Sequence, residues 1–152
     1  METIKEAKEY LKDNFEKGCS CPTCNQFVKL YKRKLGSPQT KALILLYHMN
    51  KKNNDEWVHV RDITRDLNVT SDFSKNVYWK LIEEKPLSGE DKKTSGFWRI
   101  TDKGKAFVER RIKLKSHVLI YNAKIIGFSE NYTDIISSLG KRFSYRELMN
   151  NT

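Results

Sequence analysis

The segment from Ser95 to Phe107 constrains the fold of this chain more than any other stretch. Its first part, Phe97–Ile100, is an aromatic and β-branched run that is typical of a strand. Thr101 follows directly, and a threonine there satisfies free backbone N–H groups at the start of a helix. Gly104 comes three residues later. The sequence therefore predicts a strand that leads at once into a helix, which favours an α+β fold.

A series of short elements is predicted upstream of this strand. Ser37 suits an N-cap and Pro38 the first helical position. The elements expected from these patterns are a helix from Pro38 to Met49, a strand at 57–60, a short helix at 62–67, a longer helix from Thr70 or Ser71 to about Glu84, and a polar hairpin tip at 88–94. Two helices joined by a tight turn form a helix-turn-helix pattern.

Residues 38–112 resemble the winged-helix regulators of the MarR and PadR type. In that family a strand ending in an aromatic residue, a Leu or Ile, a Thr, two further residues and a Gly close the wing. The matching run here is Trp98-Arg99-Ile100-Thr101-Asp102-Lys103-Gly104. The whole chain also resembles small proteins of phages and Gram-positive bacteria that have a Cys-Pro-x-Cys segment before a winged helix.

The resemblance implies that the second helix of the pair enters the major groove, while the wing tip contacts the DNA backbone or the minor groove. The groove-facing candidates are then Ser71, Ser74, Lys75, Asn76 and Lys80, and the wing candidates are Lys92, Lys93, Thr94 and Arg99. The helix from 71 to 84 is nearly neutral, because Asp72, Glu83 and Glu84 offset its lysines. A winged helix used for protein contacts is the alternative.

A second feature is electrostatic. The chain has a formal net charge of +10, with 29 Lys and Arg against 19 Asp and Glu. No acidic residue lies between Cys24 and Asp55, a stretch that contains Lys29, Lys32, Arg33, Lys34, Lys41, Lys51 and Lys52. Such cations are expected to contact phosphates and to make affinity salt-dependent. The alternative is a solvated face balanced by the acidic residues of the first helix. A further cluster from Arg110 to Lys115 follows a helix end, where positive charge is stabilising in any case.

Three cysteines lie within six residues, as Cys19, Cys21 and Cys24. An odd number in so short a span argues against a disulfide framework and for a reducing compartment. Cys21-Pro22-Thr23-Cys24 resembles a zinc knuckle. A structural zinc needs four ligands, so the predicted set is Cys19, Cys21, Cys24 and His48, with His59 and His117 as other choices for the fourth. The alternative is three free thiols.

The predicted organisation has three parts, at 1–37, 38–114 and 115–152. The first contains a helix that Thr3 caps and that ends near Gly18, then the cysteine loop and a basic segment at 27–34 for which we favour a helix over a strand. The last contains a hairpin at 117–121 and 124–128 around Asn122-Ala123, followed by a helix to Leu139. The expected fold is α+β, a winged helix-turn-helix with an N-terminal helix and a C-terminal β-hairpin plus helix.

These observations predict a DNA-binding protein that is not an enzyme. The three histidines are scattered and no glycine-rich phosphate loop is present. No apolar run approaches the roughly 20 residues that span a bilayer, so we expect a cytoplasmic protein with no membrane partner. A transcriptional regulator is favoured, and dimerisation through the first helix or the terminal hairpin would set half-site spacing. The alternatives are a protein-interaction module, such as a phage-encoded inhibitor or adaptor, and a replication or recombination factor that binds DNA without sequence choice.

Overall fold

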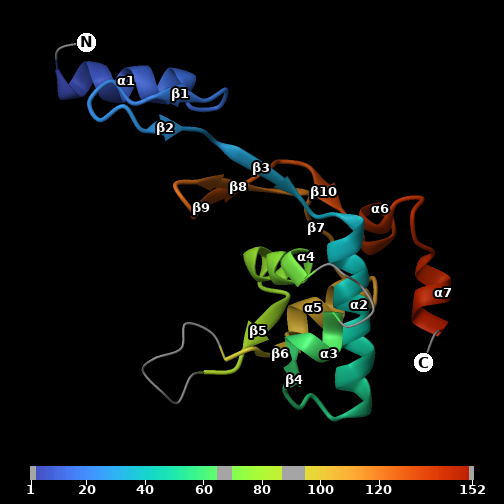
Figure 1. Ribbon diagram of the computed structural model, residues 1–152. Coiled ribbons are helices and arrows are strands. Elements are labelled where there is room, and N and C mark those ends of the chain that lie inside the picture. The colour runs from blue at the N-terminus through green and yellow to red at the C-terminus, as the bar shows by residue number, and fades with distance from the viewer. Residues whose placement is uncertain (1–2, 65–69, 87–94, 151–152) are drawn as a thin grey trace.

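The computed structural model describes residues 3–64, 70–86 and 95–150. Within these ranges short helices mix with short strands along the whole chain, and the strands form four small antiparallel sheets. Figure 1 shows α1, β1 and β2 at one end of the molecule, with α2 and the elements around it at the other. The fold is therefore of mixed α and β type, as the sequence predicts.

The helices are short apart from the first two. They are α1 (Ile4–Asn14), α2 (Ser37–Lys52), α3 (Val60–Thr64), α4 (Thr70–Ser74), the 3-10 helix η1 (Lys75–Trp79), α5 (Asp102–Val108), α6 (Ile135–Leu139) and α7 (Tyr145–Asn150). The strands are β1 (Cys19–Ser20), β2 (Phe27–Val28), β3 (Tyr31–Lys34), β4 (Val58–His59), β5 (Ile82–Glu84), β6 (Phe97–Ile100), β7 (Leu114–Lys115), β8 (His117–Tyr121), β9 (Lys124–Phe128) and β10 (Tyr132–Thr133).

Helix α2 lies at the centre of the fold and contacts α3, α4, α5, α6 and α7. Leu43, Ile44 and Leu46 on this helix are almost fully buried, and each such side chain stabilises the fold by about 1.5–3 kcal/mol. The helix begins one residue earlier than predicted. Gly36 is the N-cap, no side chain caps it, and the predicted cap Ser37 is the first helical residue.

The sheet β4–β6–β5 and α5 pack against α2. Thr101 caps α5 as predicted, because its Oγ1 accepts a hydrogen bond from the Gly104 N–H at 3.0 Å. The same hydroxyl donates to the Lys80 carbonyl oxygen at 2.7 Å, which ties the cap to the end of the η1 segment. A Cβ on Gly104 would lie 2.6 Å from Cγ1 of Ile100, so this first turn of α5 has no room for a side chain.

The predicted helix from Thr70 to Glu84 is wrong in its second half. The structure has α4 and η1, which end at Trp79, and Ile82–Glu84 is strand β5 beside β6. Lys80 ends the helical segment in the left-handed conformation, at φ 59°. The run Val77-Tyr78-Trp79 is branched and aromatic and therefore a poor helix former, whereas pairing with β6 satisfies the backbone of 82–84. The helix that resembles a recognition helix is accordingly short.

The sheet β3–β8–β9 joins the two ends of the chain, because β3 pairs with β8 across more than eighty residues of sequence. The predicted hairpin is present, and its turn residues Asn122 and Ala123 have φ of 51° and 60°. Val118 of β8 is fully buried in the core. The parts predicted at 1–37 and 115–152 thus share one sheet. The helix predicted after the hairpin, over 131–139, begins later, at Ile135, because Tyr132 and Thr133 form β10.

The helix favoured for 27–34 is also wrong. Phe27–Val28 pairs with β1 and Tyr31–Lys34 pairs with β8. Strand β8 provides the partner that makes Tyr31–Lys34 stable as a strand, and the local sequence pattern does not indicate this pairing. Consequently the cations of 29–34 are displayed along the edge of a sheet.

Candidate nucleic-acid interface

Strand β3 carries the densest positive charge in the described part of the fold. It forms one edge of the β3–β8–β9 sheet, and all of its residues are exposed. Lys32, Arg33 and Lys34 are consecutive, and the exposed Lys29 lies just before them. Side chains alternate between the faces of a strand, so Lys32 and Lys34 share one face and Arg33 lies on the other. The predicted phosphate contacts at 29–34 are thus gathered at one edge.

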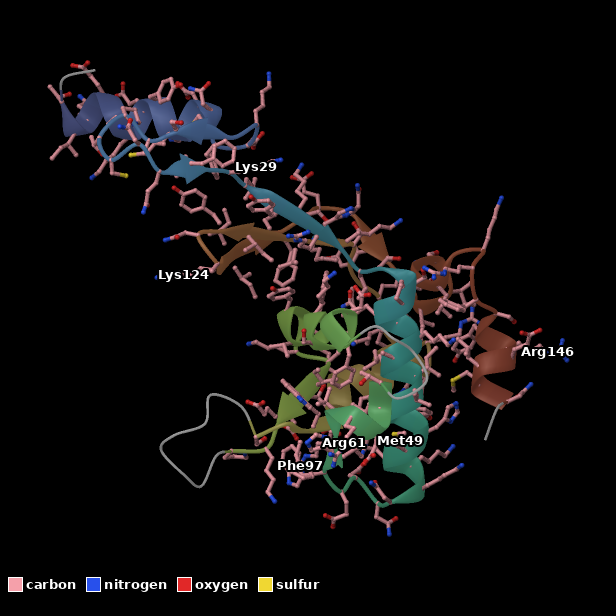
Figure 2. All side chains as sticks on the ribbon, in the orientation of Figure 1. Lys29, Met49, Arg61, Phe97, Lys124 and Arg146 are labelled. Atoms are coloured by element: carbon pink, nitrogen blue, oxygen red, sulfur yellow. The ribbon has the colours of Figure 1, made fainter. Side chains whose placement is uncertain are left out.

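The face of Lys32 and Lys34 contains two further basic groups that sequence reasoning missed. His117 is the cross-strand partner of Lys34, and Lys124 is the partner of Tyr121, which alternates onto the same face as His117. Figure 2 shows Lys124 where β9 begins and Lys29 on the segment that leads into β3. The hairpin pattern predicts the partnership of Tyr121 and Lys124, but pairing between β3 and β8 has no local signal.

Tyr31 is an exposed aromatic ring between two of these cations. The Lys29 Nζ lies 5.6 Å from the ring centroid and the Arg33 guanidinium carbon lies 5.3 Å from it. Exposed cation–π contacts of this kind contribute about 0.5–1 kcal/mol and leave the charge available to an anion. The ring therefore orders the two cations without neutralising them.

Ion pairing separates this strand from the helix and wing. Among the residues that the structure describes, no carboxylate forms an ion pair with the cations of the β3 strand or with Lys29. By contrast, the Lys75 Nζ lies 2.9 Å from Asp72 Oδ1. Arg99 pairs with Glu83, and its guanidinium carbon lies 4.2 Å from the centroid of the Trp57 ring. Two of the predicted DNA contacts are thus already engaged with protein groups.

Asn76 is not a groove-facing residue, and that prediction is wrong. Its side chain is fully buried and donates to the carbonyl oxygens of Gln39 at 3.2 Å and Phe73 at 3.0 Å. It also accepts a hydrogen bond from Gln39 Nε2 at 3.2 Å. The η1 turn directs this amide towards α2, where it fastens the helical segment to the centre of the fold.

The remaining helix and wing candidates have different positions. Ser74 and Lys80 are exposed, while Ser71 lies in α4 with a side chain outside the described part of the structure. Lys92, Lys93 and Thr94 also lie outside the described residues. Lys41 is half-buried in α2, and its Nζ lies 4.6 Å from the centroid of the Phe143 ring, against which Arg142 also packs. The structure therefore places Lys41 beside the segment that joins α6 and α7.

The end of the helical segment is covered by the C-terminal hairpin. Trp79 Nε1 donates to the Lys115 carbonyl oxygen at 2.8 Å, and its ring centroid lies 6.1 Å from that of Phe128 in β9. The sheet with the exposed cations is consequently attached directly to η1.

The cysteine segment folds into a hairpin turn. The Cys21 N–H donates to the Gln26 carbonyl oxygen at 2.7 Å, and the Asn25 N–H donates to the Cys21 carbonyl oxygen at 2.9 Å. Hydrogen bonds from Thr23 and from the backbone of Cys24 lower the pKa of the Cys21 thiol to about 7. Such donors stabilise a thiolate, which is the form that binds metals.

The predicted set of four metal ligands is not assembled. Cys19 lies in β1 opposite Val28, and His48 is buried in α2 with its Nε2 2.8 Å from the Leu148 carbonyl oxygen. Within the described ranges, no group of three or more His, Cys, Asp or Glu side chains is arranged to hold a metal ion. The structure brings together Cys21 and Cys24 alone.

A polar cluster separate from the cysteine turn lies in the C-terminal half of α2. The Tyr47 hydroxyl donates to Glu109 Oε2 at 2.8 Å, and Arg111 donates to the same carboxylate. Burial, together with Glu109, raises the pKa of Tyr47 to about 12, and the hydrogen bonds from Tyr47 and Arg111 lower the pKa of Glu109. A cleft of about 290 Å³ adjoins these groups. Because each polar group has a protein partner, the cluster stabilises the packing of α5 on α2.

None of the described helices combines the length and the apolar character that crossing a bilayer requires. The fold and the site were also compared with known proteins. No family model, no curated protein and no solved structure matched the chain.

Proposed function

We propose that this protein binds DNA, and that the exposed cations of β3 supply most of its affinity through phosphate contacts. The observation that supports this most is the contrast in ion pairing. Lys29, Lys32, Arg33 and Lys34 have no ion-pair partner among the described carboxylates, whereas Lys75 and Arg99 each have one. A cation without a carboxylate partner breaks no ion pair within the protein when it contacts a phosphate. The contact also releases counterions from the DNA.

The arrangement around the strand supports a winged-helix scaffold for this function. The order α2, β4, α3, α4 with η1, β5 and β6, with strands arranged β4–β6–β5, is the order of a winged helix. Phe128 and Trp79 hold the β3–β8–β9 sheet against η1. A duplex seated at α4 would therefore have phosphates near this sheet, and the helix and sheet would form one interface.

The same geometry favours backbone contacts over base readout. Asn76, which suits adenine recognition by its chemistry, is buried, and Lys75 is paired. Ser74 and Lys80 are the exposed candidates left on the described part of the helical segment. We therefore propose that phosphate contacts dominate, with a role in transcription if Ser71, Ser74 or Lys80 reads bases, and a role as an accessory factor if none does.

A salt titration tests the proposal. A labelled duplex of random sequence is titrated with the protein at several salt concentrations, and the logarithm of the binding constant is plotted against the logarithm of salt concentration. Four phosphate contacts predict a slope of about −3.6, from about −0.9 for each contact. No binding at low salt would refute the proposed function. Selection from a random duplex pool then separates the two roles, because an enriched sequence indicates a regulator and uniform recovery indicates an accessory factor.

A further inference from the structure

The turn from Cys21 to Asn25 is a tight reversal of the chain between β1 and β2. Asn25 has φ 60°, which lets the chain reverse directly after Cys24. The Cys21 sulfur is in hydrogen-bonding contact with the Thr23 hydroxyl at 3.2 Å. The turn is closed by hydrogen bonds from the Cys21 N–H to the Gln26 carbonyl oxygen and from the Asn25 N–H to the Cys21 carbonyl oxygen. The strands β1 and β2 hold the two ends of the turn together. Cys21 and Cys24 are therefore held on one closed turn before any metal binds.

Both cysteines line one cleft, although Cys21 is buried. A cleft of about 310 Å³ is lined by Cys21 and Cys24 together with Lys29, Tyr31 and the hairpin turn at Asn122. Cys24 is exposed. No carboxylate lines the cleft among the described residues, so its only charged wall is the Lys29 ammonium. A net negative metal–thiolate centre would be stabilised here.

One chain supplies half of a tetrahedral thiolate site. Zinc in structural sites takes four ligands, and the residues described here bring no third His, Cys, Asp or Glu to this pair. Cys19 is held in β1 and His48 is held by Leu148, so neither is placed to complete it. Figure 1 shows β1 and β2 at one end of the molecule, beside α1.

We propose that two copies of this chain share one Zn²⁺ ion, with Cys21 and Cys24 of each copy as its four ligands. Each thiol loses its proton to solvent when its Zn–S bond forms, so four protons are released for each ion. The centre then has a net charge of −2, from one Zn²⁺ and four thiolates, and the Lys29 side chains of the two copies offset it. No electron transfer is involved. The zinc-linked dimer and the proposed DNA binding both involve Lys29, but zinc content and duplex binding are measured separately, so either proposal can fail without the other.

The test uses the full chain, purified under a phosphine reductant and dialysed against Zn²⁺ alone. Elemental analysis is expected to give one zinc ion for every two chains, and light scattering is expected to give twice the mass of the chain. A chelator is expected to return the monomer. Replacement of Zn²⁺ by Co²⁺ is expected to produce the visible absorption of a tetrahedral thiolate site.

Two single variants form a matched pair. Cys24→Ser is expected to abolish both zinc retention and the dimer, whereas Cys19→Ser is expected to preserve both. The circular dichroism spectra of the two variants show whether each has folded. The proposal would be overturned by one zinc ion for each monomeric chain or by no zinc at all. A dimer that survives the chelator, or loss of zinc in Cys19→Ser, would also overturn it.

Discussion

Asn76 illustrates how a single buried amide fixes the position of a helix. It links Gln39 of α2 to Phe73 of α4 through hydrogen bonds at its nitrogen, and its oxygen accepts from the Gln39 side chain. Asn76→Ala removes the hydrogen-bond partner of the buried Gln39 side-chain amide and of the Gln39 and Phe73 carbonyl oxygens. A buried polar group that stays without a partner costs about 1–3 kcal/mol. We expect the free energy of unfolding, measured by urea denaturation, to fall by about 2–3 kcal/mol.

Lys75→Gln is the control for this prediction. It lies next to Asn76 but removes only a partly exposed ion pair with Asp72, which contributes at most about 1 kcal/mol. A smaller loss in Asn76→Ala than in Lys75→Gln would contradict the structural role of Asn76 and return it to the set of base-reading candidates.

Tyr47 and Glu109 make stability depend on pH. The pKa of Glu109 is lowered from its ordinary value, so its contribution is present above about pH 4.5 and is lost as the pH falls through its lower folded-state pKa. The raised pKa of Tyr47, about 12, means that the hydroxyl contribution is lost only as the pH rises towards that value. Tyr47→Phe is expected to cost about 1 kcal/mol at neutral pH and less in acid, where Glu109 is protonated.

Urea denaturation of the wild type and of Tyr47→Phe, at neutral pH and at a pH low enough to protonate Glu109, measures this difference. Arg111→Gln serves as a comparison, because Arg111 donates to the same carboxylate from a more exposed position. A cost for Tyr47→Phe that stays constant as Glu109 becomes protonated would show that the hydroxyl acts through packing and not through the carboxylate.

At the scale of single elements, the hairpin turn stores local strain. Asn122 and Ala123 both have positive φ, the pattern of a tight two-residue turn that favours Asn followed by Gly. An alanine in this conformation is strained by about 1–2 kcal/mol. We expect Ala123→Gly to raise the free energy of unfolding by about 0.5–1 kcal/mol, after the greater chain entropy of unfolded glycine is subtracted.

The matched control is Ala106→Gly in α5, where the same substitution removes helix propensity and a buried methyl group. That variant is expected to be less stable by about 1 kcal/mol or more. Thermal denaturation of Ala123→Gly and Ala106→Gly measures this difference. Equal destabilisation by the two substitutions would contradict the positive φ of Ala123.

The elements with local signals were the predictable ones. Thr3 and Thr101 cap their helices through hydrogen bonds to residues three positions on, and the hairpin has alternating strands around a two-residue turn. Strand β3 was not predictable in this way, because its partner β8 is distant in sequence. The end of the helical segment at Trp79 was missed for the same reason, since the pairing of β5 with β6 overrides helix periodicity.

The candidate site shows the same division. The cations of 29–34 are visible in the sequence, but their display along a sheet edge depends on β8. The burial of Asn76 depends on its contact with Gln39, and the pairing of Arg99 depends on Glu83 in the neighbouring strand. The separation of His48 from the cysteines is likewise a property of the packing of α2 on α7.

At the scale of the whole molecule, one sheet connects the N-terminal segment, the C-terminal hairpin and the helical segment. Backbone pairing joins β3 to β8, and the contact of Phe128 with Trp79 joins β9 to η1. The exposed cations are therefore a fixed extension of the fold. This arrangement supports an interface in which the sheet supplies phosphate contacts and the helix supplies a smaller share.

The salt dependence of duplex binding in matched variants tests this account most directly. The variants are Lys32→Gln/Arg33→Gln/Lys34→Gln on β3, Lys75→Gln/Lys80→Gln on the helical segment, and Lys5→Gln/Lys103→Gln/Lys141→Gln as a control with the same loss of charge as the first. The account predicts that the β3 variant flattens the logarithmic salt slope by about 2.7, that the helix variant flattens it by less than about 1, and that the control leaves it unchanged. A wild-type slope in the β3 variant, or an equal loss in the control, would contradict it.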